Sequence, residues 1–301
     1  MDANMRLREQ GLDLINANFN LPGRHNILAK RKSIVSGYTK LWDVMIREWR
    51  APRITDAVWL IYAASYLFNT RGLKWAVDPV SLGNLVPEAP AIDAGRDLND
   101  LDFVLLTHDH ADHTDIGLWN QIKDSRCHWV VPAHMAERFF DNMRLKRPRC
   151  SVVVPEQKIM LAGACITPFD APHTPPGVTN KINAFGYLVE TANGSYLLPG
   201  DIRAYDPLCL ERFKGVSAVF AHVFLGRAAA RDPNPPLLAA FVKFYLNCHP
   251  KKIVLAHLYE FARQPEDCWL AEHADALVRV FAAADHGVAI VTPEWFRETL
   301  L

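Results

Sequence analysis

The feature that most constrains this chain is the stretch 107–113, which holds three histidines and two aspartates within seven residues. It directly follows Phe103–Leu106, a short apolar run between polar residues that predicts a buried strand. The polar stretch therefore begins at the carboxyl end of a strand, where ligand sites of α/β proteins gather. Imidazole nitrogens and carboxylate oxygens are ligands of zinc and similar metals. The sequence therefore predicts a metal site in this loop instead of a solvated polar turn.

This stretch resembles the His-X-His-X-Asp-His motif of the metallo-β-lactamase superfamily, with its four ligand positions at His108, His110, Asp112 and His113. The resemblance extends from about Val58 to the C-terminus. It implies an α/β fold, an αββα sandwich of the metallo-β-lactamase type, with the metals at one edge. Segments 183–187 and 58–77 look most similar to the branch that contains ascorbate-6-phosphate lactonase and the N-acylphosphatidylethanolamine phospholipase D type.

The resemblance also implies three further ligands, each just past a predicted strand: His173, Asp201 and His257. In the family pattern His173 joins His108 and His110 at a first metal. Asp201 then bridges to a second metal, which Asp112, His113 and His257 complete. Asp78, which ends the predicted strand 73–77, is expected to be a structural or supporting carboxylate and not a direct ligand.

Strands and helices alternate after residue 53, which favours α/β layering in two halves, roughly 54–165 and 166–301. We therefore predict a catalytic domain at 53–301 and an N-terminal helical extension at 1–52. Two amphipathic helices are expected in the extension, around 7–15 and 41–49, with the basic stretch Lys30–Lys32 between them. The extension is either a helical layer packed on the outside of the domain or a lid or dimer arm that shapes access to the metals.

Composition narrows the class of protein. Lys plus Arg and Asp plus Glu both number 33, so the formal net charge is zero, which argues against a nucleic-acid partner. The six cysteines include no Cys-X-X-Cys pair, and such scattered cysteines are typical of a reducing compartment. The longest apolar run, 57–68, is too short to span a bilayer, and the first residues lack the apolar core of a signal peptide. We expect a cytoplasmic protein without a membrane span, and a homo-oligomer stays open.

These residues and the resemblance imply a binuclear metal-dependent hydrolase, and the likeness to the lactonase and phospholipase D branch implies a small-molecule substrate, a lactone, ester or phosphodiester. Two divalent ions, expected to be Zn²⁺ with Mn²⁺ or Fe as alternatives, would hold a bridging hydroxide at neutral pH. Asp112 is the candidate catalytic residue, and the resemblance makes His222 and Arg227 candidates for substrate binding, since the family's corresponding loop lines the substrate pocket. Two alternatives stay open: an iron-dependent oxidoreductase on the same fold, since imidazole and carboxylate also suit iron, and a metal-binding scaffold without turnover.

Overall fold

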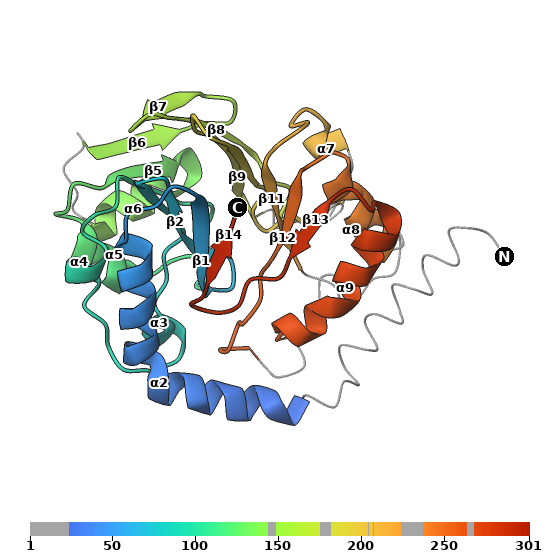
Figure 1. Ribbon diagram of the computed structural model, residues 1–301. Coiled ribbons are helices and arrows are strands. Elements are labelled where there is room, and N and C mark those ends of the chain that lie inside the picture. Colours follow the sequence, from blue (N-terminus) through green and yellow to red (C-terminus); the bar gives the residue numbers. More distant parts are fainter. Residues whose placement is uncertain are drawn as a thin grey trace.

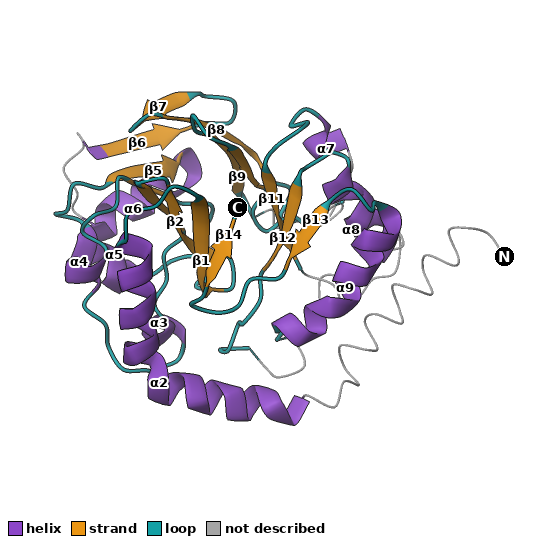
Figure 2. Cartoon of the chain, in the orientation of Figure 1, coloured by secondary structure: helices purple, strands orange, loops and turns teal. Residues whose placement is uncertain are grey.

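The computed structural model describes residues 24–143, 149–174, 182–203, 205–206, 208–223, 237–263 and 268–301, and within these it leaves undescribed the side chains of residues 24–27, 237–239, 271–273 and 276. Figure 1 shows two β-sheets face to face, and Figure 2 shows helices on the outer side of each sheet. This arrangement confirms the predicted αββα sandwich. The expected helix around 7–15 and the candidate Arg227 lie outside the described residues.

The first sheet has the order β14-β1-β2-β3-β4-β5-β6. Its strands are β1 (Asp56–Tyr62), β2 (Ser65–Thr70), β3 (Leu73–Val77), β4 (Phe103–Leu105), β5 (His128–Pro132), β6 (Cys150–Val153) and β14 (Glu298–Leu300). β1, β2 and β3 pair antiparallel, whereas β3 to β6 run parallel, with Ala76 opposite Val104 and Val104 opposite Trp129. All seven residues of β1 are buried, because this strand is covered on both faces.

The second sheet has the order β13-β12-β11-β10-β9-β8-β7. Its strands are β7 (Ile159–Leu161), β8 (Ala164–Asp170), β9 (Phe185–Glu190), β10 (Ser195–Leu198), β11 (Ala218–His222), β12 (Lys252–Ala256) and β13 (Ala289–Val291). β7 to β10 pair antiparallel and β10 to β13 pair parallel. The strands β8, β10, β11 and β12 therefore all point the same way, and their carboxyl ends meet at one edge.

Aromatic rings join the two sheets. Tyr66 and Phe68 on β2 pack against Phe220 on β11, with ring centroids 5.1 and 5.4 Å apart. Phe68 also stacks on Trp75 of β3 at 3.7 Å. Such large buried rings remove much apolar surface from water, at roughly 25 cal/mol per Å². They make a rigid interior below the edge where the parallel strands end.

The outer helices form two groups. α2 (Arg24–Arg50), α3 (Leu82–Leu85), α4 (Ala94–Asp97), α5 (Ile116–Ile122) and α6 (Ala136–Met143), with the 3₁₀ turn η1 (Ala133–Met135), lie on the side of the first sheet in Figure 1. α7 (Leu208–Glu211), α8 (Leu237–Leu246) and α9 (Ala271–Ala284) lie on the side of the second sheet. None of the helices in the described part of the chain combines the length and apolar character that crossing a bilayer requires.

Helix α2 differs from the sequence prediction in extent. It includes Lys30–Lys32, so this basic stretch is helical and does not connect two helices. Trp42, Met45, Ile46 and Trp49 are buried as expected, but Leu41 and Val44 are 40% and 37% exposed. The reason is the helical period, which places 42, 45, 46 and 49 on one face and turns 41 and 44 away from it.

Two indole hydrogen bonds fix α2 to the domain. Trp42 Nε1 donates to Asp97 Oδ2 at 2.8 Å, and Trp49 Nε1 donates to the Phe68 carbonyl, also at 2.8 Å. Both rings belong to the same hydrophobic cluster as the sheets. This part of the chain therefore shares the core of the sandwich, while the division at residue 52 stays a prediction.

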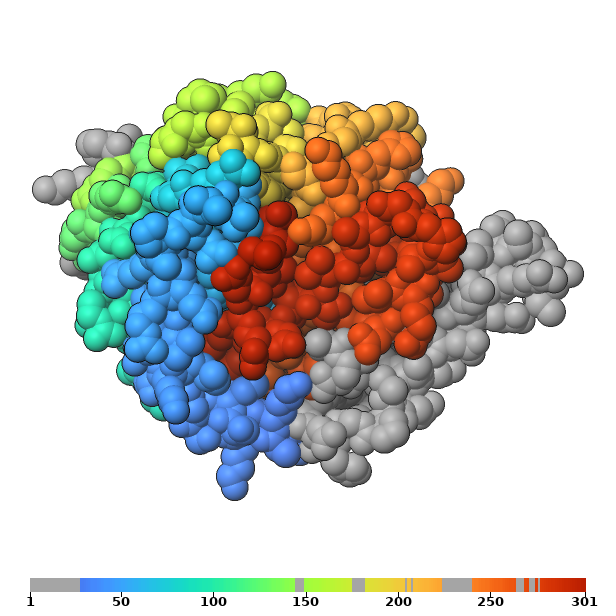
Figure 3. All heavy atoms as spheres, viewed as in Figure 1, coloured from blue at the N-terminus to red at the C-terminus, as the bar shows by residue number. Residues whose placement is uncertain are grey.

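The two sequence halves do not match the two sheets completely. β14 returns from the C-terminus to pair antiparallel with β1, with Ala57 opposite Leu300, and β7 begins at Ile159, before the expected boundary at 165/166. Figure 3 shows this red C-terminal segment directly against the blue segments of α2 and β1. A three-residue strand is too short for its periodicity to show in the sequence, so β14 was not predicted. The amphipathic spacing of 265–284 predicts a helix over that range, but α9 begins later, at Ala271.

Candidate metal centre

The structure brings all seven predicted ligands together at the edge where parallel strands end. His108, His110, Asp112 and His113 follow β4, whereas His173, Asp201 and His257 follow β8, β10 and β12 respectively. Two groups result, each with ligand atoms within 4.8 Å of one another. The first comprises His108, His110, His173 and Asp201, and the second comprises Asp112, His113, Asp201 and His257. Asp201 belongs to both.

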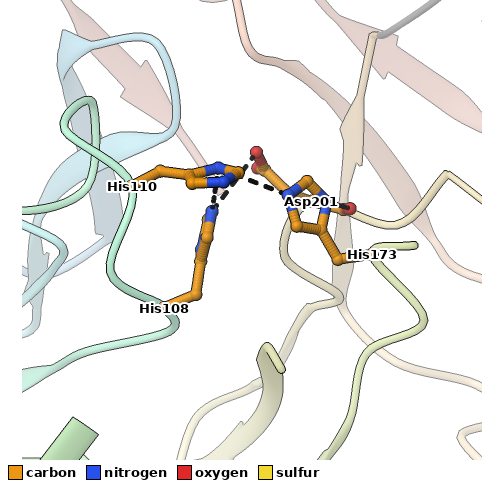
Figure 4. Close-up of side chains that lie close together, drawn as sticks. All are labelled: His108, His110, His173 and Asp201. Atoms are coloured by element: carbon orange, nitrogen blue, oxygen red, sulfur yellow. Dashed lines mark hydrogen bonds and ion pairs between the residues drawn. The ribbon is translucent and has the colours of Figure 1, made fainter. Parts of the chain in front are cut away.

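The first group is shown in Figure 4, where three imidazoles and the Asp201 carboxylate converge. His110 Nδ1 lies 3.0 Å from His108 Nε2 and 3.3 Å from His173 Nε2. Asp201 Oδ2 lies 3.8 Å from His108 Nε2. Ligand atoms held about 2.0–2.2 Å from one tetrahedral ion lie about 3.3–3.6 Å apart. The spacing of this group therefore fits a single four-coordinate ion.

The second group has more carboxylate. His113 Nε2 and His257 Nε2 lie 3.3 and 3.2 Å from Asp201 Oδ2. Asp112 Oδ2 lies 4.0 Å from His113 Nε2 and 3.8 Å from His257 Nε2. His113 Nε2 is buried and has no hydrogen-bond partner of acceptable geometry, although the ring's other nitrogen is well bonded. A buried nitrogen without a partner is costly, and a bound metal ion would satisfy it.

One oxygen of Asp201 serves both groups. Oδ2 faces His108, His113 and His257, whereas Oδ1 lies 2.9 Å from His222 Nδ1. His222 is buried and thus contacts a predicted ligand, which the sequence had not indicated. Its role in substrate binding stays a prediction. Gly200, at φ +71°, lets the chain turn into Asp201, and a Cβ there would lie 3.1 Å from the Phe185 carbonyl.

The imidazole nitrogens that face away from the centre also lie against polar atoms. His113 Nδ1 lies 2.7 Å from Asp78 Oδ2, and His257 Nδ1 lies 3.0 Å from Glu260 Oε2. His173 Nδ1 lies 2.6 Å from the Asp201 carbonyl, and His108 Nδ1 lies 3.0 Å from Thr107 Oγ1. Such partners fix the ring orientation and the tautomer, so that Nε2 of each of these four rings is left for a metal.

Asp78 has the supporting position expected from the sequence. Besides His113, it accepts hydrogen bonds from the Thr107 backbone N–H at 2.8 Å and from the Thr107 hydroxyl. Sequence reasoning missed Thr107 and Glu260, and it also missed Arg263, which contacts Glu260. The spacing His257-X-X-Glu260-X-X-Arg263 was the available signal, but it carries meaning only if the segment forms turns.

Two of these side chains depend on unusual backbone. Asp78 has φ +42° and His257 has φ +65°, in the left-handed region that residues with a Cβ rarely adopt. The His257 N–H donates to the Ala63 carbonyl at 3.0 Å, which helps to hold this conformation. Strained backbone of this kind persists where several contacts with neighbouring residues hold it, and it is common at functional sites.

The protonation states of the donor side chains are those that suit a bound cation. Burial lowers the pKa of His108 and His110 and lowers the pKa of His173 to about 4, so these rings are neutral near pH 7. Burial opposes charge on His113 as well, but Asp201 and Asp112 outweigh it and raise the pKa of His113. The pKa of Asp201 lies well below its usual value because His257 and His113 outweigh the effect of burial. The negative charges of Asp201 and Asp112 favour a proton on His113. A bound metal ion would take the place of that proton.

The comparisons with known proteins agree with this geometry. A family model described as the beta-lactamase superfamily domain matches residues 76–258, more than half of the chain. Among proteins with curated descriptions, none gives a significant match.

Solved structures share the fold at low identity. A protein named as a candidate metal-dependent hydrolase from Parabacteroides distasonis is 18% identical, with a TM-score of 0.54, over 79% of this chain and 92% of that one. An isothiocyanate hydrolase from Delia radicum gut bacteria is 18% identical, with a TM-score of 0.56, over 81% and 99%. CmlA, a diiron β-hydroxylase from Streptomyces venezuelae, is 15% identical, with a TM-score of 0.54, over 83% and 54%. At these identities the likeness shows the fold alone.

Proposed function

The chain belongs to the metallo-β-lactamase superfamily, and on that premise we propose that it is a hydrolase that uses two divalent metal ions. The observation that carries this proposal is the pair of four-residue donor groups that share Asp201. Imidazole and carboxylate donors in such a mixture suit Zn²⁺, Mn²⁺ or Fe. His108, His110 and His173 would hold the first ion, Asp112, His113 and His257 would hold the second, and Asp201 would hold both.

Bound metal ions would supply a hydroxide nucleophile at neutral pH and would stabilise the oxyanion that develops in hydrolysis. Side chains outside the ligand set contribute by holding the ligands in position. Asp78 and Glu260 orient His113 and His257, and His222 holds one oxygen of Asp201 so that the other faces the ligands. Asp112 is 17% exposed, so its carboxylate is accessible to a substrate and can accept a proton in the reaction.

The substrate class that we propose is a small lactone, ester or phosphodiester. A panel of these compounds tests it, assayed with purified protein after loading with Zn²⁺, Mn²⁺ or Fe²⁺. An isothiocyanate belongs in the panel because one structural neighbour is named for that activity. We expect turnover of at least one class that depends on the added metal and is lost in His108→Ala/His110→Ala.

An iron-dependent oxidation is the second candidate, because a structural neighbour is named a diiron β-hydroxylase. Elemental analysis of protein grown without added metal separates the two. Iron as the main metal, a coloured solution and no hydrolysis in the panel would favour oxidation. Full metal loading with neither activity would favour a metal-binding scaffold.

A further inference from the structure

We propose that Arg263 binds an anionic group of the substrate, a carboxylate or a phosphate, beside the second metal subsite. This inference rests on the proposed function, since it assumes a substrate at the metal centre. The substrates proposed above include neutral and charged compounds. This inference restricts them to compounds that carry a carboxylate or a phosphate. It also gives a role to an arginine that is absent from the predicted ligand set.

The position of the guanidinium supports this proposal. Arg263 Nη2 lies 3.8 Å from Asp112 Oδ2, so the group borders the second donor group. The Arg263 side chain is 37% exposed, whereas Glu260 beside it is 1% exposed. Within the described part of the chain, neither Nη group of Arg263 donates a hydrogen bond. Partly exposed donors without a hydrogen-bond acceptor are available to a ligand.

A buried carboxylate holds Arg263 in place. Glu260 Oε1 contacts Arg263 Nε, while Glu260 Oε2 lies 3.0 Å from His257 Nδ1. The Arg263 backbone N–H also donates to the Glu260 carbonyl at 3.0 Å, which closes a turn between them. One carboxylate thus fixes both a predicted metal ligand and the arginine. An arginine fixed through Nε loses little further freedom when its two Nη groups bind an oxyanion.

The charges of the site favour an anion. Four carboxylates lie within or against the two donor groups, Asp78, Asp112, Asp201 and Glu260. Their formal charge equals that of two divalent ions, so the charge of Arg263 is additional. Lys30 on α2 places a further cation over the ring of Tyr259, two residues after His257, with Nζ 5.8 Å from the ring centroid. Charges of one sign at a cleft raise the local concentration of ligands of the opposite sign.

The experiment measures the binding of inorganic phosphate and of acetate to the full-length, metal-loaded protein by titration calorimetry. Arg263→Met is compared with wild type and with a matched control, Arg126→Met. Arg126 is also paired with a carboxylate, Asp102, at 3.0 Å, but it lies near the amino end of β5, away from the metal centre. Metal content is measured for every variant.

We expect Arg263→Met to weaken binding of at least one probe about tenfold or more, which is typical for loss of a charged hydrogen bond. Arg126→Met should leave binding unchanged, and both variants should retain their metals. Arg263→Lys keeps the charge without the two-pronged geometry, so it should bind with intermediate affinity. The probe with the larger loss identifies the group, phosphate or carboxylate.

Equal affinity of Arg263→Met and wild type for both probes would overturn the proposal, as would a wild-type protein that binds neither probe. Should Arg263→Met lose metal, Arg263→Lys decides, and wild-type affinity in that variant overturns the proposal. The result is distinguishable from failure of the proposed function. Arg263-dependent anion binding without hydrolysis would contradict only the function, whereas hydrolysis with Arg263-independent anion binding would contradict only this inference.

Discussion

The two donor groups of the metal centre are supported differently. In the first group, the outer nitrogens of His108 and His173 contact neutral partners, the Thr107 hydroxyl and the Asp201 carbonyl. In the second, the outer nitrogens of His113 and His257 each contact a buried carboxylate. A carboxylate partner makes an imidazole a more basic ligand. The second donor group is therefore surrounded by more negative charge than the first, and its imidazoles depend on residues outside the predicted ligand set.

The largest effect that we expect concerns Asp112, which belongs to the second group alone. Asp112→Asn removes a ligand charge and a proton acceptor, so turnover of any panel substrate should fall about 10²–10⁴-fold. Asp109→Asn is the matched control, because Asp109 lies in the same loop but pairs with Arg138 at 3.0 Å, outside both groups. Steady-state kinetics at full metal occupancy measure both variants. Equal turnover of Asp112→Asn and the control would remove Asp112 from the chemistry.

A smaller effect tests the supporting carboxylates directly. Asp78→Asn and Glu260→Gln should each weaken the binding of one of the two ions about 10–100-fold, because they withdraw the negative partner of His113 or His257. The other ion should bind as in wild type. Competition with a chromophoric chelator resolves the two affinities. If both ions weaken equally in these variants, the subsites are not supported independently and the comparison is wrong.

The smallest effect that we expect concerns His222, which supports a ligand common to both donor groups. His222 contacts Oδ1 of Asp201, the residue common to both groups. His222→Ala should therefore weaken both ions by a similar factor, about 2–10-fold, which corresponds to the loss of one ordinary hydrogen bond. The same chelator competition measures it. A loss confined to one ion would mean that Asp201 does not act equally in the two subsites.

The strands before the seven predicted ligands could be read from the sequence because their apolar patterns are clear, whereas the ligand set itself was implied by the resemblance to the family. His257 illustrates this, since the run 252–256 predicts its strand and the strand delivers the side chain to the edge. The α/β layering followed from the alternation of strands and helices, and the resemblance implied the sandwich. The burial of Trp42 and Trp49 also followed, from helical spacing alone.

The missed features depend on contacts between distant segments or on turn geometry. Glu260 and Arg263 reach the centre only because the chain turns sharply after His257, where two residues of positive φ occur at His257 and Tyr259. Helical or strand periodicity does not describe such a segment. β14 is defined by its pairing with β1, almost the whole chain away, and not by its own three residues. The sequence made His222 a candidate for substrate binding, and only the folded sheet shows its contact with Asp201.

The central claim is that these residues form two metal subsites that share Asp201, and metal content per chain tests it most directly. Wild-type protein and His108→Ala/His110→Ala are purified, incubated with excess Zn²⁺, desalted and measured by elemental analysis, with folding checked by circular dichroism. We predict about two ions per chain in wild type and about one in the variant, because the variant removes two ligands of the first group only. Equal metal content in the two folded proteins would contradict the account.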